Sequence, residues 1–227
     1  MKKCGAQTIW LSELIEKSRS PAVHIRPPTS GSSEDRMLYT AYRNVQIQEI
    51  SDGGFWHADE VHYESGSLET SEPVRSIGHW NKPDQVEIFQ VTSGRVMMIV
   101  VPRSPVDVIY AANYAAGDSC VIPLGAFHLT YSPWTASTVF NISFEGAAPP
   151  DQKYDRHPAP EISAVLESNR IRLETPAGMS VKTDQLSPVL SSVPSDLAKF
   201  LCAARPSDLA ELRAEVAALT AAGWPAR

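Results

Sequence analysis

The feature that most constrains how this chain folds is a series of short β-type segments between residues 37 and 148. Gly, Pro, Asp, Asn or Ser residues separate most of these segments, and no helical stretch long enough for a crossover connection lies between them. The segments cover residues 38–50, 55–63, 74–79, 86–91, 96–101, 106–110, 119–122 and 138–144. Many short strands with turn residues between them favour an antiparallel sandwich or barrel over a parallel α/β sheet. We therefore expect an all-β core.

An N-terminal extension, residues 1–36, precedes these segments. Residues 12–17 have the pattern of a short capped helix, and residues 21–35 are rich in proline, serine and threonine, as loops are. We expect this loop to separate the extension from the β-rich core of residues 37–148.

A C-terminal extension, residues 149–227, follows the core and differs from it in pattern. Two further strands are expected near Ile171 and Met179, and Ser195 and Ser207 resemble the N-caps of one or two helices. The second helix carries an apolar stripe formed by Leu209, Leu212, Val216 and Leu219. A stripe of this kind packs on its own barrel or on a sister subunit.

The composition excludes several classes of partner. With 43% hydrophobic and 20% charged residues and a formal net charge of −6, the chain has no basic surface for nucleic acid or for an anionic membrane. No apolar run reaches the length of a secretion signal or a membrane span. The three cysteines are widely spaced and odd in number, which argues against a disulfide framework. We expect a cytoplasmic protein with one hydrophobic core.

Three residues of the β-rich core suggest a metal site. His79, Glu87 and His128 together offer two imidazoles and one carboxylate, a set that suits a divalent ion such as Fe, Mn, Co, Ni or Zn and leaves coordination positions open. Glu87 lies on the same strand face as apolar residues, where an unneutralised carboxylate is costly. If the strands that carry His79 and Glu87 are antiparallel neighbours, both side chains can share an inward face. The alternative is a hydrogen-bonded polar cluster without a metal.

The same residues lie in two stretches that resemble the two sequence motifs of the cupin superfamily. The second motif, Gly, five residues, Pro-x-Gly, two residues, His, agrees in every gap, and the first agrees in its spacing from Glu to Gly. The matching residues are Gly117, Pro123, Gly125 and His128, and His79, Glu87 and Gly94. The resemblance covers residues 74–143 and implies a cupin double-stranded β-helix, or jelly-roll barrel, that binds one divalent metal ion through His79, Glu87 and His128.

The resemblance has departures, of which Asn81 is the most important. Asn81 stands where the family has its second histidine, and it could be a weak fourth ligand or could orient a bound water or substrate. Ser132 stands where the family has its terminal asparagine, a role that Asn141 could take from the next strand.

Other polar residues near the motifs are candidate substrate contacts: Arg75, Lys82, Gln85, Tyr110 and Tyr131. Arginine or lysine would suit a phosphate or carboxylate group. His57 and His62 lie five residues apart on one expected strand, so they face opposite ways, and at most one of them can reach the site.

In their residues, the motifs are most similar to those of the archaeal cupin-type sugar-phosphate isomerases. This resemblance implies a metal-dependent isomerase. A divalent ion with open positions next to a protein base suits isomerisation, epimerisation or elimination of a small polar sugar-like or acid-like molecule. We expect Glu87, Asn81 and Tyr131 to be the catalytic residues. A two-histidine, one-carboxylate set also fits a non-haem iron dioxygenase. A cupin that binds a small ligand without turning it over is the third possibility. We expect a small-molecule substrate and a homodimer.

Overall fold

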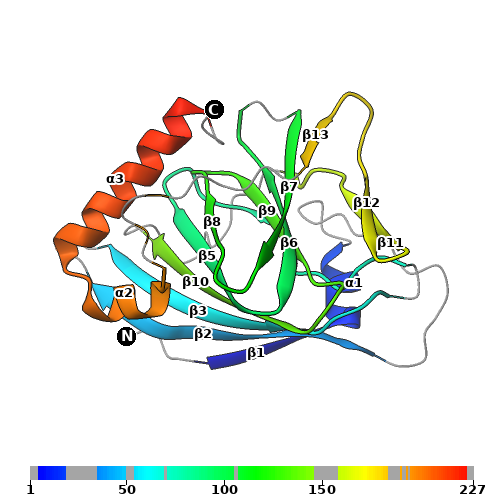
Figure 1. Cartoon of the computed structure of the whole chain (residues 1–227), viewed down its shortest axis with the longest axis horizontal. Helices are drawn as coiled ribbons and strands as arrows, with labels where there is room; N and C mark the ends of the chain where they lie inside the picture. The colour runs from blue at the N-terminus through cyan, green and yellow to red at the C-terminus, as the bar shows by residue number, and fades with distance from the viewer. Residues whose placement is uncertain are drawn as a thin grey trace.

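The computed structural model describes residues 5–18, 35–49, 54–68, 71–104, 107–145, 158–183, 190, 193 and 195–223. Two β-sheets face each other and carry almost all of the strands (Figure 1). The six-stranded sheet has the order β1 (Gly5–Trp10), β2 (Met37–Glu49), β3 (Phe55–Tyr63), β10 (Ser137–Glu145), β5 (Val86–Ser93) and β8 (Ser119–Ile122).

The five-stranded sheet has the order β13 (Ser180–Thr183), β7 (Val108–Ala115), β6 (Arg95–Val101), β9 (Phe127–Tyr131) and β4 (His79–Trp80). All pairings are antiparallel except that of β13 with β7. A separate hairpin of β11 (Ser163–Glu167) and β12 (Arg170–Glu174) completes the strands. The helices are α1 (Leu11–Ser18), α2 (Leu197–Ala203) and α3 (Pro206–Ala222).

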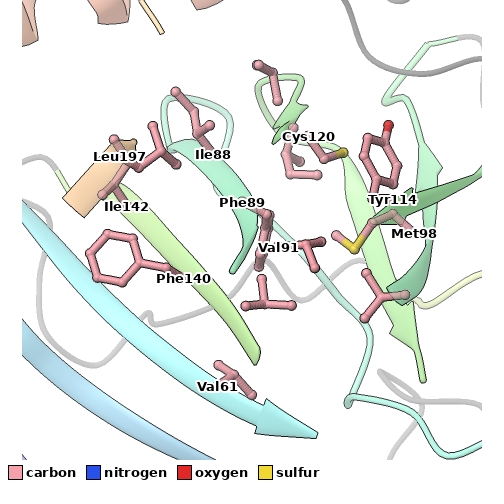
Figure 2. Close-up of a cluster of buried hydrophobic side chains, with 14 of the residues drawn as sticks. Val61, Ile88, Phe89, Val91, Met98, Tyr114, Cys120, Phe140, Ile142 and Leu197 are labelled. Atoms are coloured by element: carbon pink, nitrogen blue, oxygen red, sulfur yellow. The ribbon is translucent and has the colours of Figure 1, made fainter. Parts of the chain in front are cut away.

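The core has two parts because successive side chains of a strand point to opposite faces. On β6, Val96, Met98 and Val100 belong to the main cluster, whereas Ile99 and Val101 belong to a smaller one. Figure 2 shows part of the main cluster, with Phe89 and Val91 of the six-stranded sheet next to Met98 and Tyr114 of the five-stranded sheet. The smaller cluster lies on the opposite face of the five-stranded sheet and includes residues of the β11–β12 hairpin.

The C-terminal helices pack on the barrel. The predicted stripe residues of α3, Leu209, Leu212, Val216 and Leu219, are all buried in the main cluster. Leu197 of α2 lies beside Ile142 and Ile88, on the face of the six-stranded sheet that looks away from the other sheet (Figure 2). The prediction of an all-β jelly-roll barrel with C-terminal helices is therefore confirmed. Among the described residues, no helix has the length and apolar character needed to cross a membrane.

The N-terminal segment belongs to the barrel, although only a helix and a loop had been expected there. Residues 5–10 form β1, which pairs with β2, and Leu11 and Leu14 of α1 are buried in the main cluster. Most of the loop expected at residues 21–35 lies outside the described residues.

Several local expectations were wrong. β9 had not been expected, and residues 74–79 contain one isolated bridge, at Arg75, and the first residue of β4 instead of one strand. Asp196, not Ser195, caps α2, because its side chain accepts a hydrogen bond from the Lys199 N–H. Arg205, not Ser207, precedes α3, where Pro206 occupies the first helical position.

Candidate metal centre

The three predicted ligands meet between the two sheets. His79 on β4 and His128 on β9 are directly paired in register, and their Nε2 atoms are 3.2 Å apart. Glu87 projects from β5 of the other sheet, and its Oε2 atom is 3.1 Å from His128 Nε2. One ligand atom from each of the three residues lies within 4.8 Å of the others. The cluster therefore brings together residues that are up to 49 positions apart in the chain.

The way in which His79 and Glu87 meet differs from the expectation. The two strands are not antiparallel neighbours, because β4 pairs with β9 and β5 pairs with β10 and β8. The chain crosses from one sheet to the other through residues 81–85, where the Lys82 N–H donates to Gln85 Oε1 at 3.2 Å. The imidazole and the carboxylate thus approach each other from opposite sheets.

Two asparagines hold the Glu87 carboxylate. Asn81 donates from Nδ2 to Oε2 at 3.0 Å, and Asn141 donates from Nδ2 to Oε1 at 2.7 Å. Burial by itself raises the pKa of Glu87, but His128, His79 and the Asn81 amide outweigh it and lower that pKa to about 2. Glu87 is therefore ionised at neutral pH although its side chain is only 6% exposed.

His79 is a neutral ligand in the same environment. Burial and the adjacent His128 lower the pKa of His79 to about 3, against the opposing effects of Glu87 and of a hydrogen bond to the Ile77 backbone. The Nε2 atom of His79 faces His128 Nε2 at 3.2 Å, inside the cluster. A neutral imidazole is the form that binds a metal.

The donor set fits a cation. His128 Nε2 lies 3.2 Å from His79 Nε2, 3.2 Å from Asn81 Oδ1 and 3.1 Å from Glu87 Oε2. A neutral imidazole nitrogen carries at most one hydrogen, so it cannot satisfy three acceptors at once. Lone pairs that converge in this way are what a divalent ion with nitrogen and oxygen ligands would satisfy.

Tyr131, which had been expected among the catalytic residues, does not reach this cluster. It lies three positions after His128 on β9, so the alternation of the strand turns it to the other face, within the smaller apolar cluster. Its ring is fully buried there, and burial raises the pKa of its hydroxyl. Of the expected catalytic residues, Glu87 and Asn81 lie in the cluster.

The expected substrate contacts are dispersed. Arg75 is buried in an ion pair with Glu72, whose Oε1 lies 3.0 Å from Arg75 Nε. Gln85 accepts from the backbone of Lys82, and Tyr110 faces the main core with Lys182 5.6 Å above its ring. None of these interactions involves a member of the cluster.

The two histidines of β3 face opposite ways, as predicted. His62 is on the outer face and contacts Glu60, with 48% of its side chain exposed. His57 lies 2.7 Å from Ser143 Oγ through its Nε2 atom. Ser143 had not been predicted, although it lies two residues from Asn141 on β10 and so shares its face.

Comparisons with known proteins give distant structural likeness only. No family model and no curated protein matches the chain. Similar solved structures include cupin-family proteins. An oxalate oxidase in complex with glycolate is 17% identical with a TM-score of 0.33 over 46% of this chain and 44% of its own. KdgF from Halomonas sp. is 15% identical with a TM-score of 0.33 over 49% of this chain and 82% of its own.

A third similar structure is Bacillus subtilis oxalate decarboxylase, which is 12% identical with a TM-score of 0.34 over 57% of this chain and 35% of its own. This chain therefore spans less than half the length of the oxalate oxidase and the oxalate decarboxylase. Similarity at such low identity carries no information about the reaction.

Proposed function

We propose that this protein is a metal-dependent enzyme of the cupin type that moves a proton on a small oxygenated molecule, in an isomerisation, an epimerisation or an elimination. The observation that carries the proposal is the convergence of His79, Glu87 and His128 from two sheets, with an ionised carboxylate at its centre. The ion is a single divalent cation, Fe, Mn, Ni, Co or Zn. The substrate is a sugar-like or acid-like molecule.

Each residue of the cluster has a separate task. His79, His128 and Glu87 hold the ion, which when bound polarises a carbonyl or hydroxyl oxygen of the substrate. Asn81 keeps the Glu87 carboxylate oriented through its amide and presents its own oxygen to the same space. A carboxylate with a low pKa is a weak base, so Glu87 acts mainly as a ligand.

Dioxygen chemistry is the second candidate, because two histidines and one carboxylate are also the ligand set of non-haem iron oxygenases. The two reactions differ in their need for oxygen. An oxygenase loaded with ferrous iron consumes dioxygen with its substrate, whereas an isomerase or lyase works equally well without air. A barrel that only binds its ligand does neither.

Elemental analysis of protein purified without chelator tests the proposal. We expect about one equivalent of a divalent transition metal per chain, in line with a single three-ligand site. His128→Ala and Glu87→Gln are expected to lose it while the barrel stays folded by circular dichroism. The matched control is His62→Ala, since His62 is a histidine of the outer face and should leave the metal content unchanged.

Absence of metal, with none taken up on soaking, would leave a hydrogen-bonded polar cluster and overturn the metalloenzyme proposal.

We also propose that the chain is a cytoplasmic homodimer. Size-exclusion chromatography with light scattering would show a dimer mass, and a monomer mass at all concentrations would contradict this proposal.

A further inference from the structure

A row of polar residues extends from the metal cluster across the inner face of the six-stranded sheet. In register, Glu87 of β5 lies opposite Ser143 of β10, and Ser143 lies opposite His57 of β3. Directly opposed residues of antiparallel strands point to the same face. The three side chains therefore share the face on which Glu87 meets the two histidines of the cluster.

The next row, two residues further along the strands, continues this polar patch. Asn141 of β10 lies opposite Asp59 of β3, and one row further the opposed residues are the apolar Val139 and Val61. The inner face is thus polar near Glu87 and becomes apolar at the Val139–Val61 pair. The polar residues at this level are Glu87, Asn141, Ser143, His57 and Asp59, which we call the polar row.

His57 is the centre of a chain of contacts in the polar row. Its Nε2 atom is 2.7 Å from Ser143 Oγ, and its Nδ1 atom is 3.7 Å from Asp59 Oδ1. A serine, a histidine and an aspartate therefore follow one another in space, with the histidine between them. The Nδ1 distance is long for a hydrogen bond, but contacts between catalytic groups are often long before a substrate binds.

Asp59 is fixed in place from the other side. The Arg43 guanidinium is 2.6 Å from Oδ2, and the Asn44 N–H donates to Oδ1 at 2.7 Å. Both residues lie in a β-bulge of β2, where Asn44 has a φ of 55°, a left-handed conformation that few non-glycine residues adopt. Bulges of this kind often aim side chains at functional sites. The carboxylate beside His57 is thus ionised and held by the backbone.

Two features of the polar row suit a ligand that forms hydrogen bonds. Asn141 Oδ1 is buried and has no hydrogen-bond partner among the described residues. A buried acceptor left in this state is unfavourable, and a hydroxyl group of a ligand would satisfy it. The His57 side chain keeps 12% of its surface exposed, so solvent reaches part of this residue.

We propose that His57 is the acid–base group of the site, linked to the substrate through the Ser143 hydroxyl and positioned by Asp59. The inference rests on the proposed function and adds a base to the metal centre. In the proton transfer, the Ser143 hydroxyl gives its hydrogen to His57 Nε2 and takes one from the substrate. Ser143 is left unchanged, His57 becomes an imidazolium, and the substrate loses one proton.

The spacing of the polar row also defines the substrate class. One strand spacing, roughly 5 Å, separates the backbones at Glu87 and Ser143, which are opposed on neighbouring strands. A molecule that reaches from the cluster to Ser143 is therefore small, as a sugar or a hydroxy acid is, and carries hydroxyl groups, one of which donates to Asn141 Oδ1. A base at some distance from the ion acts on a different atom from the one that the ion polarises, as isomerisation and elimination require.

Nuclear magnetic resonance of the histidine side-chain nitrogens tests the relay without any substrate. We expect His57 in the wild-type protein to be the neutral tautomer with its hydrogen on Nδ1, because Nε2 accepts from Ser143. The resonances that disappear in His57→Gln are those of His57. The resonances of His62 should be unchanged in every variant. A His57 tautomer with its hydrogen on Nε2 would overturn the proposal, since that nitrogen could not accept a proton through Ser143.

Chemical modification of His57 provides a second readout. Diethyl pyrocarbonate attacks the free lone pair of a neutral imidazole, so Ser143→Ala should speed modification of His57 on the order of tenfold by removing the bond to Nε2. Asp59→Asn should slow it by a similar factor, since the carboxylate that favours a hydrogen on Nδ1 is lost. Unchanged rates in both variants, measured by peptide mass spectrometry with His62 as internal reference, would contradict the relay.

The metal content of the same variants separates the two proposals. Ser143→Ala and His57→Gln are expected to bind metal as the wild type does, because neither residue is a ligand. If the wild-type protein contains no metal but His57 has the expected tautomer, the proposed function is contradicted and the proposal that His57 is an acid–base group still stands. If the protein contains metal but His57 carries its hydrogen on Nε2, only the proposed proton relay through Ser143 is contradicted.

Discussion

The side-chain amide of Asn81 binds Glu87, with Nδ2 3.0 Å from Oε2, while its oxygen lies 3.2 Å from His128 Nε2. Asn81 is completely buried and occupies the position at which the cupin motif has a histidine. The residue therefore touches two of the three proposed ligands and cannot be replaced without disturbing both.

Asn81→Ala should weaken metal binding. Loss of the amide leaves the Glu87 carboxylate less firmly oriented, and groups that orient metal ligands typically contribute ~10–100-fold in affinity. Competition with a metal-sensitive dye would measure the change. Asn113→Ala is the control, because Asn113 is an asparagine of β7 on the other sheet face and has no contact with the cluster. Equal affinity in both variants would contradict the role given to Asn81.

Asp59 should make the free energy of unfolding depend on pH in the acid range. Burial raises its pKa, but His57, Arg43 and the Asn44 N–H outweigh burial and lower the pKa from 3.8 to about 2. A carboxylate with a depressed pKa in the folded state stabilises the protein above pH 4, and this stability is lost as the pH falls from about 4 to about 2.

Urea unfolding of the metal-free protein at several pH values would measure this effect. The contribution of Asp59 at neutral pH is on the order of 2 kcal/mol. Asp59→Asn should be less stable at pH 7 and should approach the wild type near pH 2. A constant difference between the two proteins across this range would show that the carboxylate charge is not the cause.

Tyr131→Phe should keep its metal and should not lose stability. The Tyr131 hydroxyl is buried without a hydrogen-bond partner among the described residues, so its removal is neutral or stabilising by up to about 1 kcal/mol. Tyr63→Phe is the matched comparison, since Tyr63 is equally buried and bonds Thr130 and Ser76. Thermal unfolding and metal content would be measured for both variants. Loss of metal from Tyr131→Phe would show that Tyr131 belongs to the site after all.

Gly94→Ala should destabilise the barrel strongly. Gly94 has a φ of 76°, and a Cβ atom there would lie 2.6 Å from the Ala136 carbonyl oxygen. We expect a loss of roughly 3 kcal/mol from backbone strain and overpacking together. Gly117 has a φ of 97° with open space around it, so Gly117→Ala should cost only about 1 kcal/mol of strain. Equal losses in urea unfolding would show that the contact at Gly94 is unimportant.

The sequence predicted that His79, Glu87 and His128 lie together, because motif spacing carries that information directly. His79, Glu87 and His128 were identified from their positions relative to the glycines and Pro123, and these turn residues fix where the strands begin and end. Tyr131 was misplaced because closeness in sequence was taken as closeness in space. On a strand, three positions reverse the face, and His128 and Tyr131 point to opposite sides of the sheet.

The pairing of strands could not be predicted from local pattern. Whether β4 pairs with the strand that follows it or with β9, 47 residues further on, depends on the closure of the whole barrel. For the same reason the contact between His57 and Ser143, 86 positions apart, was not foreseen. The alternation of β3 showed only that one of its two histidines faces inward.

An ion at the cluster would fasten one sheet of the barrel to the other, since His79 and His128 belong to the five-stranded sheet and Glu87 to the six-stranded sheet. Any motion that parts the sheets would then have to break a bond to the ion. A bound ion would therefore slow every motion in which the two sheets separate, and removal of the ion would make such motions faster.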